Sequence, residues 1–136
     1  MCLDNWYPDT SGTGSVTAVT SCGQFNTCVQ LATGSSGNDA SLSQVITNAR
    51  SGYTYTFTFS FRGIDTLSSD AVLTCTINDG GPGLIWTRTA DEIPTLGGYG
   101  YFMNTFTAPS SSLLLNCAFS GSESSTVQAT YFNVNC

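Results

Sequence analysis

The sequence carries groups that stack and donate hydrogen bonds, and it lacks the groups that most hydrolases need. It contains no histidine and no lysine, and its cations are three arginines. Without histidine, neither a Ser-His nor a Cys-His nucleophile pair can be assembled. The adjacent carboxylates Asp91 and Glu92 would point to opposite faces of a strand, whereas glycoside hydrolysis needs two carboxylates facing each other across a cleft. We therefore expect a site that works by binding and placement, with no metal and no cofactor.

The candidate site combines aromatic planes, a thioether and two guanidinium groups. Aromatic planes stack on sugar rings and on flat apolar molecules, and guanidinium groups donate hydrogen bonds to oxygen-rich ligands. Period-two geometry puts Trp86 and Arg88 on one face of their strand, and Tyr101 and Met103 on one face of another. If these strands adjoin the strand of Arg62, the three faces form one pocket, although core packing is an equal alternative for Trp86. The predicted ligand-binding residues are Trp86, Arg88, Arg62, Tyr101 and Met103.

The clearest element that would position such a site is the segment from Tyr53 to Arg62, which alternates aromatic and small polar residues. An alternating strand puts one face on a core and leaves the other facing solvent or a ligand. The residues predicted to be buried are Tyr53, Tyr55, Phe57, Phe59 and Phe61. The residues predicted not to be buried are Thr54, Thr56, Thr58 and Ser60.

Seven further segments have the length and the flanking turn residues of strands, and none shows a sustained helical period. They are Val29–Ala32, Leu42–Ile46, Ala71–Ile77, Leu84–Thr89, Tyr101–Ala108, Ser112–Phe119 and Thr126–Val134. The stretches 9–23 and 90–100 are interpreted as long connections. Many short strands separated by turn signals predict an all-β, antiparallel sandwich with no helix longer than two turns. Because the chain has 136 residues, we expect a single domain over 1–136.

The composition limits the classes of partner. The formal net charge is −6, only 9% of the residues are charged, and 40% are hydrophobic. Nucleic acids and anionic membrane surfaces are bound through clusters of cations, so we expect neither as a partner. No apolar run approaches the length that spans a bilayer. The expected partner is a glycan or a small hydrophobic or aromatic molecule, and the oligomeric state is left open.

Six cysteines in a chain without histidine predict disulfides rather than a metal site. We predict Cys22–Cys28, which closes a short loop, and Cys75–Cys117, which would join two central strands. The third predicted pair, Cys2–Cys136, ties chain ends that often lie close together. Disulfides imply an oxidising compartment, and Met1 directly before Cys2 is typical of a start added to a mature chain. We therefore expect the chain to be secreted.

Two of these segments carry a family resemblance. Residues 40–46 and 51–62 resemble the central strands of carbohydrate-binding modules of the family 4/9 type, especially modules of secreted fungal proteins. Shorter similar stretches stand at 75–77, 104–109 and 131–134. The resemblance covers about residues 28–135 and implies a jelly-roll sandwich, often with a concave sheet face that holds a glycan. Asn133 departs from the pattern, because the family tends to carry an acidic residue there.

Three functions are open at this point. The first is a binding module for a glycan, which the resemblance and the aromatic residues favour. The second is a cofactor-free cyclising enzyme of fungal natural-product biosynthesis, a pericyclase of the hetero-Diels–Alder type, because placement and one well-aimed donor can lower such a barrier. The third is a structural wall or adhesion protein. Neighbouring genes for glycan degradation would favour the first function, and a polyketide or terpene gene cluster would favour the second.

Overall fold

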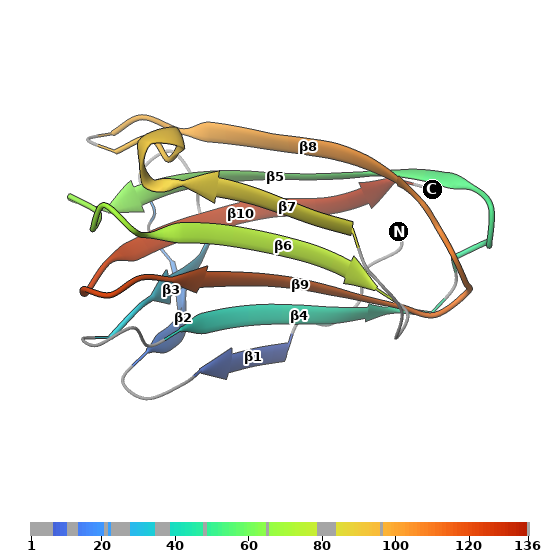
Figure 1. Ribbon diagram of the computed structural model, residues 1–136, viewed down its shortest axis with the longest axis horizontal. Helices are drawn as coiled ribbons and strands as arrows, with labels where there is room; N and C mark the ends of the chain where they lie inside the picture. Colours follow the sequence, from blue (N-terminus) through green and yellow to red (C-terminus); the bar gives the residue numbers. More distant parts are fainter. Residues whose placement is uncertain are drawn as a thin grey trace.

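The computed structural model describes residues 7–10, 14–20, 22, 28–34, 39–47, 49–64, 66–78, 84–95 and 97–135. Two antiparallel sheets contain its ten strands (Figure 1). The first sheet has the order β1 (Tyr7–Thr10), β4 (Ala40–Ile46), β9 (Leu113–Ser120), β6 (Val72–Asn78) and β7 (Leu84–Thr89). The second sheet has the order β2 (Ser15–Val19), β3 (Cys28–Ala32), β10 (Thr126–Asn135), β5 (Thr54–Ile64) and β8 (Gly100–Thr107).

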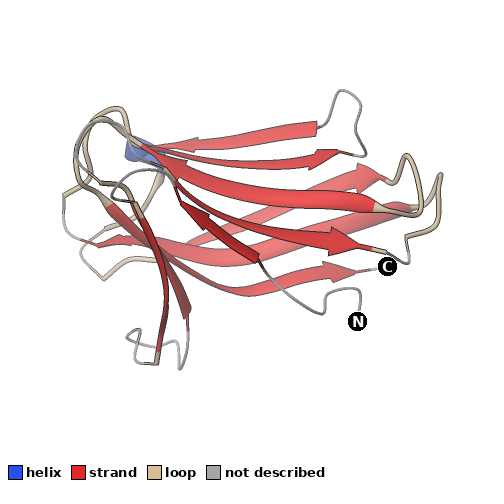
Figure 2. Cartoon of the chain, turned by 90° about the horizontal axis from the view of Figure 1, so that it is seen from below, coloured by secondary structure: helices blue, strands red, loops and turns tan. Residues whose placement is uncertain are grey.

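Strand dominates the described chain, as Figure 2 shows, and its one helix is the short 3-10 turn η1 (Ala90–Glu92). The predicted antiparallel jelly-roll β-sandwich is therefore confirmed. The described residues contain no helix that is long and apolar enough to cross a membrane.

Aromatic side chains of β5 and of its two neighbours, β8 and β10, fill the space between the sheets. Phe57, Phe59 and Phe61 of β5 are at most 2% exposed. The Phe59 ring stacks on Phe102 of β8 with 4.6 Å between centroids and on Phe132 of β10 with 5.1 Å. Each such burial contributes about 1.5–3 kcal/mol, so β5 is the strand on which the core is built.

Two positions near or within β5 depart from the predicted burial. Tyr53 is 59% exposed, because the strand begins one residue later at Thr54 and the Tyr53 ring lies 5.8 Å from the guanidinium carbon of Arg50. Thr58 is only 8% exposed, because β5 is an inner strand and Thr58 lies directly between Met103 and Asn133 of its two neighbours. The alternation therefore predicts which face of the strand each side chain is on, but it does not predict how exposed Tyr53 and Thr58 are.

All eight predicted strands are present, each with ends within two residues of the expected ones. The prediction of a long connection over residues 9–23 is wrong, because β2 (Ser15–Val19) lies inside it and pairs along β3. Val16 is half-buried and packs against the core, whereas Thr17 and Ala18 are exposed, so β2 gives a weaker alternating signal than the aromatics of β5 do.

Two of the three expected disulfides lie within the described residues. Cys75 of β6 and Cys117 of β9 are direct cross-strand neighbours with 4.1 Å between their Cα atoms, and they join the two central strands of the first sheet. Cys22 is bonded to Cys28, the first residue of β3, with 6.2 Å between Cα atoms. The expected pair Cys2–Cys136 lies outside the described residues.

Candidate functional site

The outward side of the second sheet carries a strip of small polar side chains over two adjacent strands, β5 and β10. Ser60 and Thr58 of β5 point away from the core, since they alternate with the buried phenylalanines. The register places Thr130 of β10 opposite Ser60, and Asn133 opposite Thr58. Directly opposed residues share a face. We call these four residues, Thr58, Ser60, Thr130 and Asn133, the polar floor.

Two exposed side chains of β8 border the polar floor on one side. Tyr101 lies opposite Ser60 and is 65% exposed, and Met103 lies opposite Thr58 and is 59% exposed. Because β8 is the edge strand of the second sheet, no further strand of the described chain adjoins them there. Tyr101 therefore offers an accessible aromatic plane beside a row of hydroxyl groups.

A bulge in β10 places a second exposed tyrosine at the other side of the polar floor. Between Thr130 and Asn133 the pairing with β5 shifts by one residue, and the backbone of Tyr131 adopts a φ of +58°. The extra residue lets Phe132 stack on the core while Tyr131 stays 63% exposed. Neighbouring strands lie about 4.8 Å apart, so the backbones of β8 and β10 are separated by about 10 Å.

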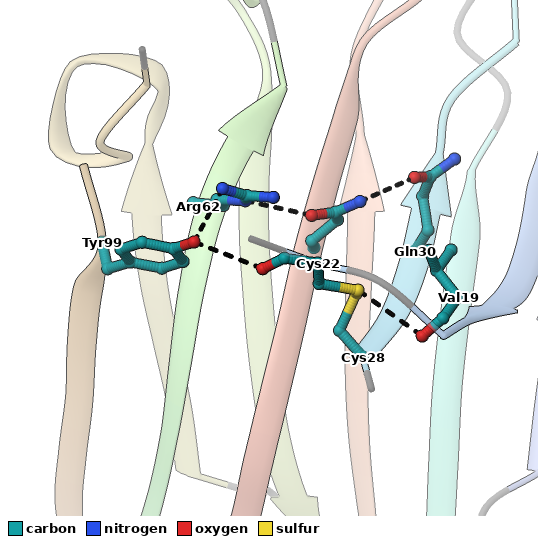
Figure 3. The surroundings of a disulfide bond; sticks show 7 residues. Val19, Cys22, Cys28, Gln30, Arg62 and Tyr99 are labelled. Carbon is teal, nitrogen blue, oxygen red and sulfur yellow. Dashed lines mark hydrogen bonds between the residues drawn. A yellow bond between two sulfur atoms is a disulfide. The ribbon is translucent and has the colours of Figure 1, made fainter. Parts of the chain in front are cut away.

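A row of hydrogen bonds closes one end of this face (Figure 3). Arg62 of β5 donates from Nε to Gln128 Oε1 at 3.0 Å and from Nη1 to the Tyr99 hydroxyl at 2.7 Å. Gln128 in turn donates to Gln30 Oε1 of β3 at 3.0 Å. The Tyr99 hydroxyl donates to the Cys22 carbonyl at 3.2 Å, so the row runs across β3, β10 and β5 to Tyr99, which directly precedes β8, and on to Cys22.

The Cys22–Cys28 disulfide packs on the same face beside this row. Cys22 is fully buried and Cys28 almost so, and the half-buried Val19 and Tyr99 pack against them. The Cys22 sulfur lies 3.5 Å from the Val19 carbonyl oxygen, which is a contact rather than a hydrogen bond, because a disulfide sulfur carries no proton. The disulfide thus anchors the carbonyl that receives the Tyr99 hydroxyl, and through Tyr99 it fixes the Arg62 guanidinium.

The structure divides the five predicted site residues between two places. Arg62, Tyr101 and Met103 share the outer face of the second sheet. Trp86 and Arg88 lie on β7, at the edge of the first sheet, and face the interior. The five therefore do not form one pocket, because β7 and β5 belong to different sheets.

Trp86 is a packing residue in this arrangement. Its ring lies 6.3 Å from Phe57, 5.9 Å from Phe102 and 6.4 Å from Phe106, measured between centroids. Arg88 covers the same seam between β7 and β8, with its guanidinium carbon 4.8 Å from the Phe102 ring centroid. These contacts agree with the alternative that the sequence left open for Trp86, namely packing against the core.

The predicted ligand-binding residues did not include Gln128, Gln30, Tyr99 and Tyr131. Period-two alternation indicates that Gln128 lies on the outer face, because it stands between Val127 and Ala129, which point inward. Tyr131 carried no such signal, since the bulge breaks the alternation at that residue.

An open apolar depression of about 310 Å³ adjoins the polar floor at Thr130. Its wall is formed by Ala18, Val29, Leu42, Ala129 and Phe132. Cys28, Thr130 and Tyr131 also line it. Thr130 therefore belongs both to the depression and to the polar floor.

The carboxylates with shifted pKa values stabilise turns. The Ser122 hydroxyl, followed by the Ser122 backbone N–H and the Ser68 hydroxyl, lowers the pKa of Asp70 below its usual value. The Thr89 backbone N–H and hydroxyl lower the pKa of Glu92, which caps η1. Among the described side chains of the outer face of the second sheet, Arg62 is the one charged group, so hydrogen bonding and stacking are what this face offers a ligand.

No protein-family model matches the sequence, and no curated protein matches it. Among solved structures, the chain is 12% identical to the module TmCBM61, solved in complex with β-1,4-galactotriose, with a TM-score of 0.74 over 98% of this chain and 89% of that one. It is 18% identical to the CBM22-1 xylan-binding domain of Paenibacillus barcinonensis Xyn10C, with a TM-score of 0.62 over 94% and 84% of the two chains. It is 8% identical to a family 11 carbohydrate-binding module of Clostridium thermocellum, in complex with a β-1,3-1,4-mixed-linked tetrasaccharide, with a TM-score of 0.61 over 94% and 86%. At these identities the likeness shows the fold: the chain has the β-sandwich of carbohydrate-binding modules.

Proposed function

We propose that the chain is a secreted carbohydrate-binding domain that holds a glycan on the outer face of β10, β5 and β8. The observation that carries this proposal is the exposed Tyr101 plane directly beside the polar floor. Aromatic planes stack on the apolar face of a sugar ring, while hydroxyl and amide groups alongside can exchange hydrogen bonds with the ring hydroxyls. The pairing of these two kinds of group on one face is what a sugar needs.

The width of the face favours a single layer of sugar rings. Tyr101 and Tyr131 stand on strands whose backbones are about 10 Å apart, with the polar floor between them. A ring placed there has an aromatic group on either side and hydroxyl groups beneath it. Met103 next to Tyr101 adds an adaptable apolar surface.

The closed end supplies a fixed donor group. The two hydrogen bonds of Arg62 and its anchor through Tyr99 to the Cys22–Cys28 loop hold the guanidinium in one place. A group that is already ordered loses little conformational entropy when a ligand binds. Arg62 therefore suits a role as a positioned cation at the end of the glycan site.

Two further observations support the proposal. The solved structures with the same fold include modules whose structures contain bound oligosaccharides. The two disulfides are compatible with an oxidising, extracellular location.

A screen of soluble polysaccharides and oligosaccharides tests the proposal. Galactan, xylan and mixed-linked glucan are the first candidates, assayed by affinity electrophoresis and then by calorimetry. Tyr101→Ala should weaken binding at least about tenfold, or about 1.4 kcal/mol. Tyr53→Ala is the matched control, because Tyr53 is equally exposed but precedes β5 and lies outside the polar floor. Equal binding by wild type and Tyr101→Ala would refute the assignment of the site to this face.

A further inference from the structure

We propose that β8 is an interface between two copies of the chain, in which the β8 strands of the two copies pair antiparallel about a twofold axis. β8 forms one edge of the second sheet, and β5 is the strand that it packs alongside. Figure 1 shows β8 along the upper border of the sandwich, with no described strand beyond it. The proposal concerns the edge of the sheet and does not depend on which ligand the outer face binds.

The edge at β8 lacks the features that usually prevent strands from pairing between molecules. Such features are charges, prolines, bulges, shortness or a covering segment. β8 has eight residues, none of them charged and none of them proline, and its pairing with β5 runs without a register shift. At the opposite edge of the sandwich, β1 and β2 are only four and five residues long and contact each other. β8 is therefore the edge that is best suited to receive another strand.

The hydrogen bonds at the end of β8 show which backbone groups point away from β5. Ala108 donates its N–H to the Tyr53 carbonyl at 2.9 Å and accepts from the Gly52 N–H at 2.8 Å. Backbone groups alternate in direction along a strand, so those of the even-numbered residues 102, 104 and 106 bond to β5. The N–H and C=O groups of the odd-numbered residues therefore point outward. Their side chains are exposed as well, and these residues are Tyr101, Met103, Thr105 and Thr107.

The outward pattern of β8 matches itself when a second copy runs antiparallel. With Asn104 on the twofold axis, Tyr101 of one copy lies opposite Thr107 of the other, and Met103 lies opposite Thr105. Every outward N–H then meets a C=O of the other strand, and aromatic side chains opposite β-branched ones are favourable cross-strand pairs. Because both copies use the same surface, the pairing closes at two chains. This self-match identifies the occupant of the edge as a second copy.

Asn104 is a polar residue in an otherwise aromatic row, and the twofold axis gives it a role. It alternates with the buried Phe102 and Phe106, yet it is itself only half-buried. A side-chain amide both donates and accepts hydrogen bonds, so two Asn104 amides that meet on the axis can bond to each other. Arg88 does not block the approach, because its guanidinium lies over the ring of Phe102, whose side chain is buried on the inner side of β8.

Sedimentation equilibrium of the wild-type chain tests the proposal first. The mass should rise from that of one chain to that of two between about 10 µM and about 1 mM, the range of weak complexes with small interfaces. Thr105→Pro removes an outward N–H without touching the bonds to β5, and proline is tolerated on an edge strand. This variant should dimerise at least about tenfold more weakly, whereas Thr105→Val, which keeps the N–H, should dimerise as the wild type does. A wild-type chain that stays monomeric throughout would overturn the proposal.

Charge pairs test the register and do not depend on how the proline variant folds. Met103 lies opposite Thr105 of the second copy, so Met103→Lys combined with Thr105→Lys sets like charges directly opposite each other and should weaken the dimer at least about tenfold. Met103→Lys combined with Thr105→Glu sets opposite charges there and should keep the dimer. Circular dichroism verifies that both double variants are folded. Equal dimerisation by the two double variants would contradict pairing through β8 in this register.

Discussion

Replacement of Trp86 by alanine should destabilise the fold rather than remove a ligand contact. The Trp86 ring lies within 6.4 Å of three core phenylalanines, measured between centroids, and it packs on the main hydrophobic cluster. A tryptophan buries about 150–250 Å², and about 150 Å² at 25 cal/mol/Å² corresponds to about 4 kcal/mol. This figure is an upper estimate, because the unfolded chain already buries part of that surface. We expect a loss of about 3 kcal/mol, within the range for large-to-small core substitutions.

The assay is equilibrium unfolding in urea followed by far-ultraviolet circular dichroism, since fluorescence would change with the tryptophan itself. A loss of this size should lower the melting temperature by about 10 °C in a chain of this length. Tyr101→Ala is the control, because an exposed residue on an edge strand should change stability by no more than about 0.5 kcal/mol. A Trp86→Ala protein as stable as the wild type, with binding lost, would refute the core assignment and restore Trp86 to the site.

Three further predictions concern the Arg62 hydrogen bonds, the Cys75–Cys117 disulfide and the stability of the fold at low pH. Arg62→Met should cost about 1–3 kcal/mol in urea unfolding, because it leaves the buried Gln128 without its donor; an unchanged midpoint would contradict this. The double variant Cys75→Ala with Cys117→Ala opens a loop with a sequence separation of 42 and should lose about 4 kcal/mol; a loss below about 1 kcal/mol would show that the bond does not constrain the unfolded chain. Because the folded pKa of Asp70 lies below its usual 3.8, ionised Asp70 stabilises the fold above about pH 4, and this contribution disappears as the pH falls through the lowered pKa. The difference between the melting temperatures of wild type and Asp70→Asn should therefore be largest near neutral pH and shrink as the pH falls through the lowered pKa, whereas a constant difference would exclude this linkage.

The alternation of β5 made the sandwich predictable. All five outward positions from Thr54 to Arg62 are polar, and all four inward positions from Tyr55 to Phe61 are aromatic. The same local rule placed Tyr101 and Met103 correctly on one face of their strand. It could not say which strands adjoin, since pairing is set by contacts far apart in sequence. The hydrogen bond between Arg62 and Tyr99 spans 37 residues, and the one between Arg62 and Gln128 spans 66.

The predicted grouping of Trp86 and Arg88 with Arg62 and the unforeseen depression have separate physical explanations. Trp86 and Arg88 were grouped with Arg62 because an arginine beside a tryptophan argued against a sealed core. In the structure the Arg88 guanidinium lies over the Phe102 ring and donates a hydrogen bond to the exposed Thr87 carbonyl, so an arginine at this position is compatible with a packed tryptophan. The depression was not predictable, because its lining residues come from β2, β3, β4 and β10, which lie far apart in the sequence. The cyclising enzyme and the wall protein stay predictions from the sequence.

Chemical-shift mapping can show whether a glycan binds the outer face of β10, β5 and β8. The ¹⁵N-labelled protein is titrated with the glycan selected in the screen, and the backbone amide shifts are followed residue by residue. We expect the largest changes at Ser60, Tyr101 and Thr130, which are neighbours across the three strands. Changes concentrated instead on Val45 and Leu114, which are exposed on the outer face of the first sheet, would contradict the account.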